Sequence, residues 1–232
     1  MNAPTTTLFC IALTFAAYAL SRYVGARVRT PFTTPVFFST ALIVGALVWA
    51  GLTATDYDPA KQILTMLLGP ATVALAVPLY NNAAALKRDL LPAALGILAG
   101  IVATVVCAVL LAQWLGLPDE LVRAGSVKSV TVAVAVQMAE VILADPSLIA
   151  GFVIASGMFG AMMGPWILSA GRVTDPVARG LAMGTIAHGQ GAAQAALEGE
   201  LQGAVAGVSM GVTAIVSAAL VPALLSYWTF SS

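Results

Sequence analysis

Apolar residues run through this chain in long stretches that contain no charged side chain. A helix needs about 17–25 apolar residues to cross the hydrocarbon core of a bilayer. Six of the stretches reach that length, and a seventh is marginal. The pattern therefore predicts an all-α polytopic membrane protein with about seven to eight transmembrane segments in a single membrane domain over residues 1–232. The stretches are 1–21, 30–55, 62–86, 90–118, 146–171, 180–197 and 201–232.

Composition supports the same interpretation. Hydrophobic residues make up 60% of the chain and charged residues 9%, whereas soluble domains carry roughly 25% charged residues. This balance excludes a soluble enzyme, a nucleic-acid binder, a disordered tail and a secreted disulfide scaffold. Large buried core helices are the alternative, but their solvent-facing sides would need charges that the stretches lack.

The first apolar run has no basic n-region and no small-residue cleavage site, so we expect Thr6–Ser21 to be a retained span. Cys10 and Cys107 both fall inside predicted spans, where we expect small apolar fillers rather than a disulfide or metal pair. The chain has one histidine and no metalloprotease or hydrolase motif. We therefore expect neither an enzyme nor a bound cofactor.

Two apolar segments contain polar side chains that lipid would not tolerate. Segment 121–144 carries Lys128, Gln137 and Glu140, and a charge at the centre of a membrane helix costs about 2.5–3.5 kcal/mol. The segment should therefore face protein or water, and we expect it to be broken or re-entrant.

The second segment, 180–199, is rich in glycine and holds the only histidine, His188. Gly189 and Gly191 flank Gln190, and each glycine weakens a helix by about 1 kcal/mol relative to alanine, so we expect local unwinding there. Unwound backbone at membrane depth must face protein or a cavity. The alternative for His188 is a simple hydrogen bond to a neighbouring helix.

Basic residues favour cytoplasmic loops. The first loop carries three arginines and no acid, which places the amino terminus outside. The loop with Arg172 and Arg179 falls inside only if segment 121–144 dips into the membrane and returns. The carboxyl terminus is then inside if 180–197 crosses once, and outside if that segment also returns.

Proline and glycine predict kinks and close helix contacts. Kinks are expected at Gly69-Pro70, Pro78 and Gly164-Pro165. Glycines spaced by four residues predict faces where helices approach closely, within the chain or in a homodimer. These glycines are Gly96 and Gly100, Gly160 and Gly164, and Gly203, Gly207 and Gly211.

Three motifs, 67–82, 127–142 and 178–195, together resemble the LrgB/CidB family, which includes the plastidial glycolate/glycerate translocator. The resemblance extends from about residue 5 to 228. It implies a multi-pass protein of the bacterial cell (inner) membrane with inverted repeats of the bile-acid/arsenite transporter type. Family members are holin-like or antiholin-like modulators of murein hydrolases and lysis, or transporters of glycolate, glycerate or pyruvate. The resemblance also implies a small LrgA/CidA-type membrane partner.

The motif residues match with some departures. Lys128, Ser129, Val130 and Thr131 match the family's K-S-V-T, but Val132 and Ala133 replace its usual Thr-Pro. A second match covers a glutamate and the G-T-x-x-H-G-x-G motif, namely Glu140, Thr185, His188, Gly189 and Gly191. Gln194 stands where the family often has a basic residue, which removes one anion contact.

Half-helices in transporters often direct their N-terminal amides at an anionic substrate. We therefore predict a site for a small carboxylate where the two interrupted segments meet. Glu140 or His188 is the candidate carrier of a coupling proton; the alternatives are an interfacial helix-end role for Glu140 and a snorkelling role for Lys128. The candidate site residues are Lys128, Ser129, Thr131, Thr185, His188, Gly189, Gln190, Gly191 and Gln194.

The sequence leaves two functions open. One is a secondary transporter of a small monocarboxylate, and the other is an antiholin-like regulator of murein hydrolase activity and lysis that acts through membrane oligomers. Polar, broken elements that face a cavity are expected of the transporter, and the chain has two segments of this kind.

Overall fold

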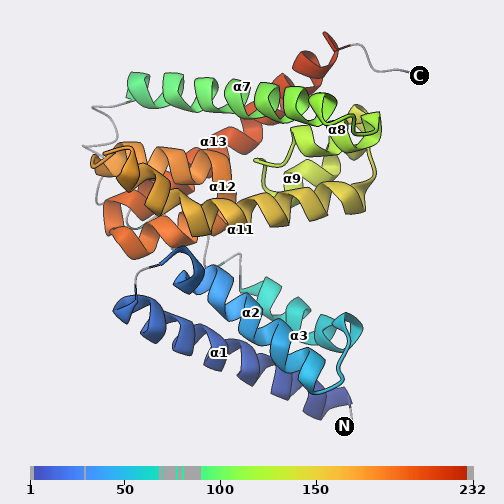
Figure 1. The fold of residues 1–232 in the computed structure, drawn as a ribbon, viewed down its shortest axis with the longest axis vertical. Helices are drawn as coiled ribbons and strands as arrows, with labels where there is room; N and C mark the ends of the chain where they lie inside the picture. Colours follow the sequence, from blue (N-terminus) through green and yellow to red (C-terminus); the bar gives the residue numbers. More distant parts are fainter. Residues whose placement is uncertain are drawn as a thin grey trace. The chain divides into compact units, whose positions relative to one another are not determined.

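The computed structural model describes residues 3–28, 30–67 and 90–228, together with residues 70, 77 and 80. Every element that these residues form is a helix, as the sequence predicts (Figure 1). The chain divides into two compact units, Met1–Val77 and Pro78–Ser232, which we describe separately. Most of motif 67–82 and the kinks expected around it lie outside the described residues.

The first unit consists of α1 (Ala3–Arg27), the 3-10 helix η1 (Pro31–Thr33), α2 (Pro35–Trp49) and α3 (Ala54–Met66). Helix α1 packs against α2 and α3. The Thr14 hydroxyl and the Tyr57 hydroxyl, 2.9 Å apart, join α1 to α3.

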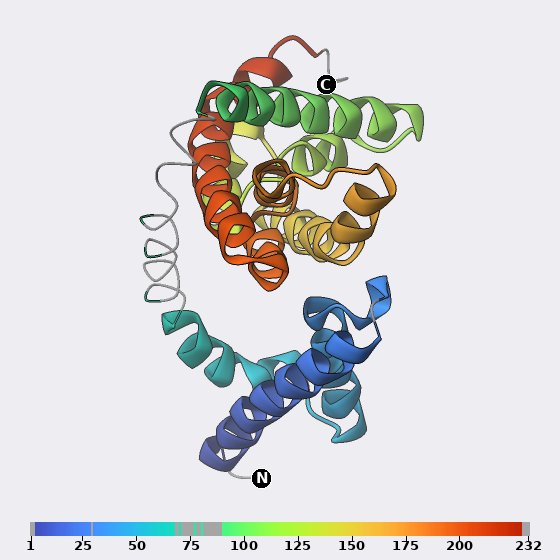
Figure 2. The ribbon, with the colours of Figure 1, turned by 90° about the vertical axis from the view of Figure 1, so that its left-hand side faces the viewer.

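The second unit holds the remaining described helices, and α12 lies against both α11 and α13 within it. Figure 2 shows α13, coloured orange to red, extending from α12 to α7. The helices are α7 (Leu90–Trp114), α8 (Asp119–Ser126), α9 (Val132–Gln137), α10 (Ala139–Ile142), α11 (Pro146–Ala170), α12 (Pro176–Glu198) and α13 (Glu200–Leu225).

Helices α11 and α12 begin with the same dipeptide, Asp-Pro. The Asp145 carboxylate accepts hydrogen bonds from the Ser147 and Leu148 amides at 2.8 and 3.0 Å. The Asp175 carboxylate accepts one from the Ala178 amide at 2.8 Å. An aspartate at the N-cap satisfies free amides of the first turn, and proline at the first helical position loses no intrahelical bond.

Four described helices are long and apolar enough to cross a membrane: Pro4–Arg27, Leu90–Trp114, Pro146–Ala170 and Glu200–Leu225. Pro35–Trp49 is apolar but shorter. The two segments with polar interruptions, 121–144 and 180–199, form no continuous apolar rod. The total of seven to eight segments and the inverted repeats stay predictions.

Helix α7 illustrates how these helices suit a bilayer. One face is buried against the rest of the unit, with Ile97, Ile101, Val105 and Val109 all at most 5% exposed. The opposite face is equally apolar but exposed. A helix that is apolar all round while packed on only one side is typical of a membrane span with lipid on the other side. The exposed residues include Leu91, Leu95, Leu98, Leu110 and Leu111.

Glycine packing is confirmed for one predicted pair. A Cβ at Gly160 would lie 2.7 Å from the Ala187 Cβ, and one at Gly164 would lie 3.1 Å from the Met183 Cε, so both glycines let α11 approach α12. Gly203 packs in the same way against Ala196, whereas Gly96 and Gly211 have open space where a Cβ would be.

Candidate functional site

The K-S-V-T motif forms a break between two short helices. Helix α8 ends at Ser126, and α9 starts after Thr131, whose backbone is extended (φ −60°, ψ 141°). The break forms even though Val132 and Ala133 replace the family's Thr-Pro. Helix α10 contacts α8, so the chain returns towards α8 after the break.

The second break lies on His188, within α12. Its backbone (φ 40°, ψ −130°) is left-handed and non-helical, while the residues on either side are helical. The expected unwinding at Gln190 between Gly189 and Gly191 is wrong by two residues. Gly191 is instead required for packing, because a Cβ there would collide with the Met183 carbonyl oxygen and lie 2.7 Å from the Ala187 Cβ.

The break turns α12 into a helical hairpin. Arg179 Nε lies 2.6 Å from Glu198 Oε2, although nineteen residues separate them along the chain. In a continuous helix this separation would span roughly 28 Å, at about 1.5 Å per residue. Residues 176–187 and 189–198 are therefore antiparallel limbs with His188 at the tip and the ion pair at the base.

One turn of α11 brings the two breaks together. The Ser156 hydroxyl donates to the Lys128 carbonyl oxygen at 2.5 Å. The His188 ring donates from Nε2 to the Val153 carbonyl oxygen at 3.1 Å. Because a carbonyl only accepts, this bond places a proton on Nε2 and leaves Nδ1 for a second partner. Both interrupted segments thus bond to the same turn of α11, and the His188 bond is the hydrogen bond to a neighbouring helix that the alternative describes.

Gly157, on the same turn, provides the space for two candidate side chains. A Cβ at this position would lie 2.5 Å from His188 Nε2 and 2.7 Å from Gln190 Oε1. Both side chains therefore lie against the bare backbone of α11. Sequence reasoning missed Gly157, although it precedes Gly160 and Gly164 on one face of the helix.

Lys128 is half-buried beside the first break. Its Nζ donates to the Ser129 hydroxyl at 3.2 Å, and Ser129 is itself buried. In the part of the chain that the structure describes, ion pairs join Lys61 to Asp58 and Arg179 to Glu198, and none includes Lys128. The break thus holds a sheltered positive charge that no described carboxylate neutralises.

Several buried side-chain oxygen atoms of the second unit have no hydrogen-bond partner. Among the described residues, these side-chain atoms are Thr185 Oγ1, Gln190 Oε1, Gln194 Oε1 and Thr213 Oγ1. Buried polar groups in folded proteins are nearly always bonded, so each unpartnered atom calls for an explanation such as a water or a ligand. Three belong to candidate residues. Thr213, on α13, was missed because a lone threonine in an apolar span gives no signal in sequence.

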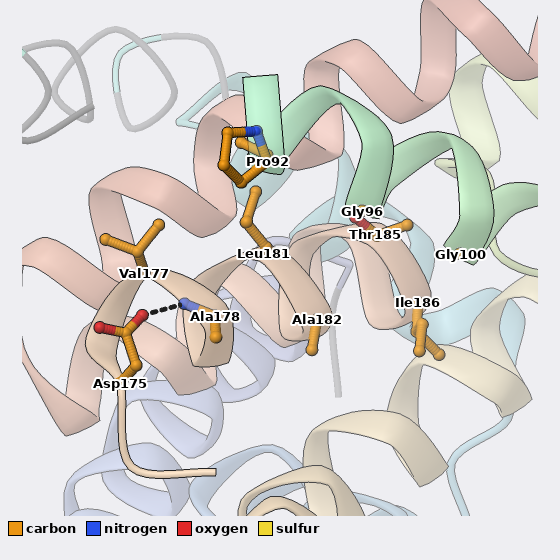
Figure 3. Close-up of a pocket in the computed structure, with 11 residues that line it drawn as sticks. Pro92, Gly96, Gly100, Asp175, Val177, Ala178, Leu181, Ala182, Thr185 and Ile186 are labelled. Atoms are coloured by element: carbon orange, nitrogen blue, oxygen red, sulfur yellow. Dashed lines mark hydrogen bonds between the residues drawn. The ribbon is translucent and has the colours of Figure 1, made fainter. Parts of the chain in front are cut away.

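Thr185 also lines a cavity of about 550 Å³ between α7 and the first limb of α12 (Figure 3). Its α7 wall is formed by Pro92, Ala93, Gly96 and Gly100. A Cβ at Gly100 would lie 3.1 Å from the Thr185 methyl group. Leu181 and Ile186 line the α12 side, so the walls are mostly apolar. Thr185 therefore faces α7, whereas His188 faces α11.

The remaining candidates lie in different surroundings. Thr131 is half-buried at the N-cap of α9, and Gly189 is exposed where the second limb begins. Glu140 is exposed on α10, two residues before that helix ends. Cys10 is buried and Cys107 is exposed, and both are free thiols.

Comparison with known proteins identifies the family. The model of the LrgB-like family matches residues 14–227. The chain is 32% identical to "Uncharacterized protein YwbG" of Bacillus subtilis (strain 168), over 79% of this chain and 81% of that protein. It is 27% identical to "Antiholin-like protein LrgB" of the same organism, over 83% and 84%. No solved structure matches the chain significantly. With its apolar helices and this match over nearly its whole length, the chain is a membrane protein and belongs to the LrgB-like family.

Proposed function

We propose that this protein is a secondary transporter of a small monocarboxylate of the glycolate, glycerate or pyruvate class across the cell (inner) membrane. The observation that carries the proposal is that the Lys128 backbone carbonyl and the His188 ring both bond to one turn of α11. Lys128 brings a positive charge that no described acid neutralises, and His188 Nδ1 donates to a ligand when the ring carries the coupling proton. A carboxylate fits this combination because it needs a cation and hydrogen-bond donors.

The second limb of α12 adds donors of its own. It begins at Gly189, directly after the break, and the first amides of a helix have no intrahelical acceptors. The positive end of the helix dipole also points toward the break, as in transporters that bind anions at broken helices. In this proposal the Gly189 and Gly191 backbone, Ser129 and Thr131 surround the carboxylate.

The unpartnered oxygens contact the rest of the substrate. Gln190 Oε1 and Gln194 Oε1 accept hydrogen bonds, and the hydroxyl groups of Thr185 and Thr213 both donate and accept. A short acid, or the waters that accompany it, satisfies these atoms. The coupling proton resides on His188, since Glu140 is exposed on α10.

The hairpin also bears on topology. If α12 enters and leaves on one side, and segment 121–144 does the same, both termini lie outside the cytoplasm. The proposal includes a homo-oligomer, a small LrgA/CidA-type membrane partner, no cofactor and no enzymatic reaction. Inverted repeats of the bile-acid/arsenite type remain part of it.

The second candidate function is an antiholin-like regulator of murein hydrolase activity and lysis. The observation that favours it is the name of several relatives, such as "Antiholin-like protein LrgB" of Bacillus mycoides (strain KBAB4), which is 28% identical. The two roles are compatible, because carboxylate flux alters the energetics of the cell.

The test is uptake by purified protein in liposomes, with a panel of labelled short 2-hydroxy and 2-oxo acids and with or without a pH gradient. The transporter proposal expects saturable uptake of at least one acid, and loss of uptake in His188→Ala. Absence of uptake for every acid, with and without the small partner, would favour the regulator.

A further inference from the structure

The base of the α12 hairpin is closed by a well-formed ion pair. Arg179 Nε and Nη2 donate to the two carboxylate oxygens of Glu198 at 2.6 and 2.9 Å, which is a bidentate arrangement. The two side chains are only 12% and 17% exposed. The pair is therefore sheltered, unlike the exposed pair between Lys61 and Asp58, whose atoms are 3.8 Å apart.

The remaining donors of Arg179 bind the end of α11 and the turn that follows. Nη1 donates to the Val173 carbonyl oxygen at 2.9 Å and to the Ser169 hydroxyl at 3.3 Å. Nη2 also donates to the Pro165 carbonyl oxygen at 3.3 Å. A guanidinium has five N–H groups, and the structure gives five acceptors. Arg179 therefore has no donor left for a substrate anion, and its role is to hold three segments together.

At the opposite end of the hairpin, His188 is held in a left-handed backbone conformation. Such a conformation in a residue other than glycine persists only where the surrounding structure imposes it. Near the tip, Gly191 packs against the first limb and Gly157 against the ring; at the base, the limbs are joined by Arg179 and Glu198. If the base opens, the limbs are free to straighten toward a continuous helix, and the ring leaves Val153.

We propose that Arg179 and Glu198 are a positioning pair that holds the α12 limbs antiparallel and thereby fixes His188 against α11. The expected effect on substrate binding rests on the proposed function, whereas the expected effect on the arrangement of the two limbs does not. Lysine cannot replace Arg179, because an ammonium lacks the planar fork that binds both carboxylate oxygens and the α11 carbonyls.

The limb geometry is tested with paired spin labels at Val177→Cys and Leu197→Cys in a cysteine-free protein. The inference expects one short, narrow distance distribution, which broadens and lengthens in Arg179→Gln and in Arg179→Lys. Lys61→Gln, which removes the exposed ion pair, is the matched control and should leave the distance unchanged. An unchanged distance in Arg179→Gln would overturn the inference.

Arg179→Gln leaves a half-buried carboxylate without its partner, so a poorly folded variant is covered by Glu198→Gln, which removes the carboxylate and leaves the Arg179 bonds to α11 in place. A longer or broader limb distance in Glu198→Gln supports the inference, and an unchanged distance in that variant overturns it. In liposomes, Arg179→Lys should raise KM by about tenfold or more, since small misplacements of a binding group have effects of this size. Normal limb distances with no uptake in the unaltered protein would refute the transporter and leave the positioning pair standing.

Discussion

Gly157 and His188 share one contact that only glycine permits. The imidazole lies where a Cβ of residue 157 would be, 2.5 Å from Nε2, while the same nitrogen donates to the Val153 carbonyl oxygen. The position of the histidine ring is thus set by a missing side chain on the neighbouring helix. This dependence makes Gly157 the most direct place to disturb the site without touching a candidate residue.

Gly157→Ala should displace the histidine ring and break its bond to Val153. Overpacking a close contact costs about 1–3 kcal/mol, and we expect uptake to fall by about tenfold, because 1.4 kcal/mol corresponds to that factor. Gly151→Ala is the control, since nothing lies within 4 Å of its Cβ on the same helix. Equal uptake by the two variants at equal membrane insertion would show that ring position is unimportant.

Thr185→Val separates a ligand-binding role from a structural role. Valine keeps the shape of the side chain and removes a hydroxyl that has no described partner, so the thermal stability of the ligand-free protein should stay the same or rise. Uptake should fall by about tenfold, which matches one lost hydrogen bond of about 1–1.5 kcal/mol. Thr185→Ser should retain uptake. A less stable Thr185→Val with normal uptake would assign the hydroxyl to the fold.

Lys128→Gln tests the charge at the first break. The variant removes the cation but keeps a donor of similar length, so the apparent affinity for the transported acid should fall by at least about tenfold, as expected for a charge-assisted hydrogen bond of about 1.5–3 kcal/mol. Lys61→Gln removes an exposed lysine and should have no effect. Unchanged KM in Lys128→Gln would favour the snorkelling role.

Asp56, at the start of α3 and outside the four candidate spans, provides a pH-dependent prediction. Hydrogen bonds from the Thr53 hydroxyl and backbone amide hold the pKa of the Asp56 carboxyl below its usual range. The pKa of Asp56 is lower in the folded protein than in the unfolded chain, so the ionised carboxylate stabilises the folded state. This contribution to folding stability is complete above the unfolded-state pKa, and it is lost as the pH falls through the folded-state pKa. Thr53→Ala should raise the Asp56 pKa, measured by carboxyl ¹³C NMR. Identical titrations would contradict the capping geometry.

The sequence was most informative where polar residues interrupt apolar runs. Lys128 and His188 stand in segments that lipid excludes, and both lie at breaks. The position of the second break was harder to predict, because local propensity favours unwinding at glycine. Gly191 packs against Met183 and keeps a helical backbone, and the non-helical backbone conformation occurs at His188 instead.

Two further features had no local signal. In the sequence, Arg179 stands out only as a loop charge that indicates orientation. In the structure it pairs with Glu198, nineteen residues away, because the hairpin brings the two together. The α11 residues that bind both breaks could not be predicted from the sequence either. Val153 acts through its backbone carbonyl, and Ser156 acts through a hydroxyl in an otherwise apolar helix. Backbone acceptors and tertiary pairings leave no pattern in a single sequence.

The central claim is that the two breaks hold a carboxylate between Lys128 and His188. Solid-state NMR of the protein in lipid, with a ¹³C-carboxyl-labelled acid taken from the uptake panel and ¹⁵N-labelled lysine and histidine, measures this contact. We predict a dipolar coupling that places the carboxyl carbon within about 4 Å of Lys128 Nζ, which is the range of an ion pair. This coupling should be lost in Lys128→Gln. A bound acid whose carboxyl carbon couples to neither Lys128 nor His188 would contradict the claim.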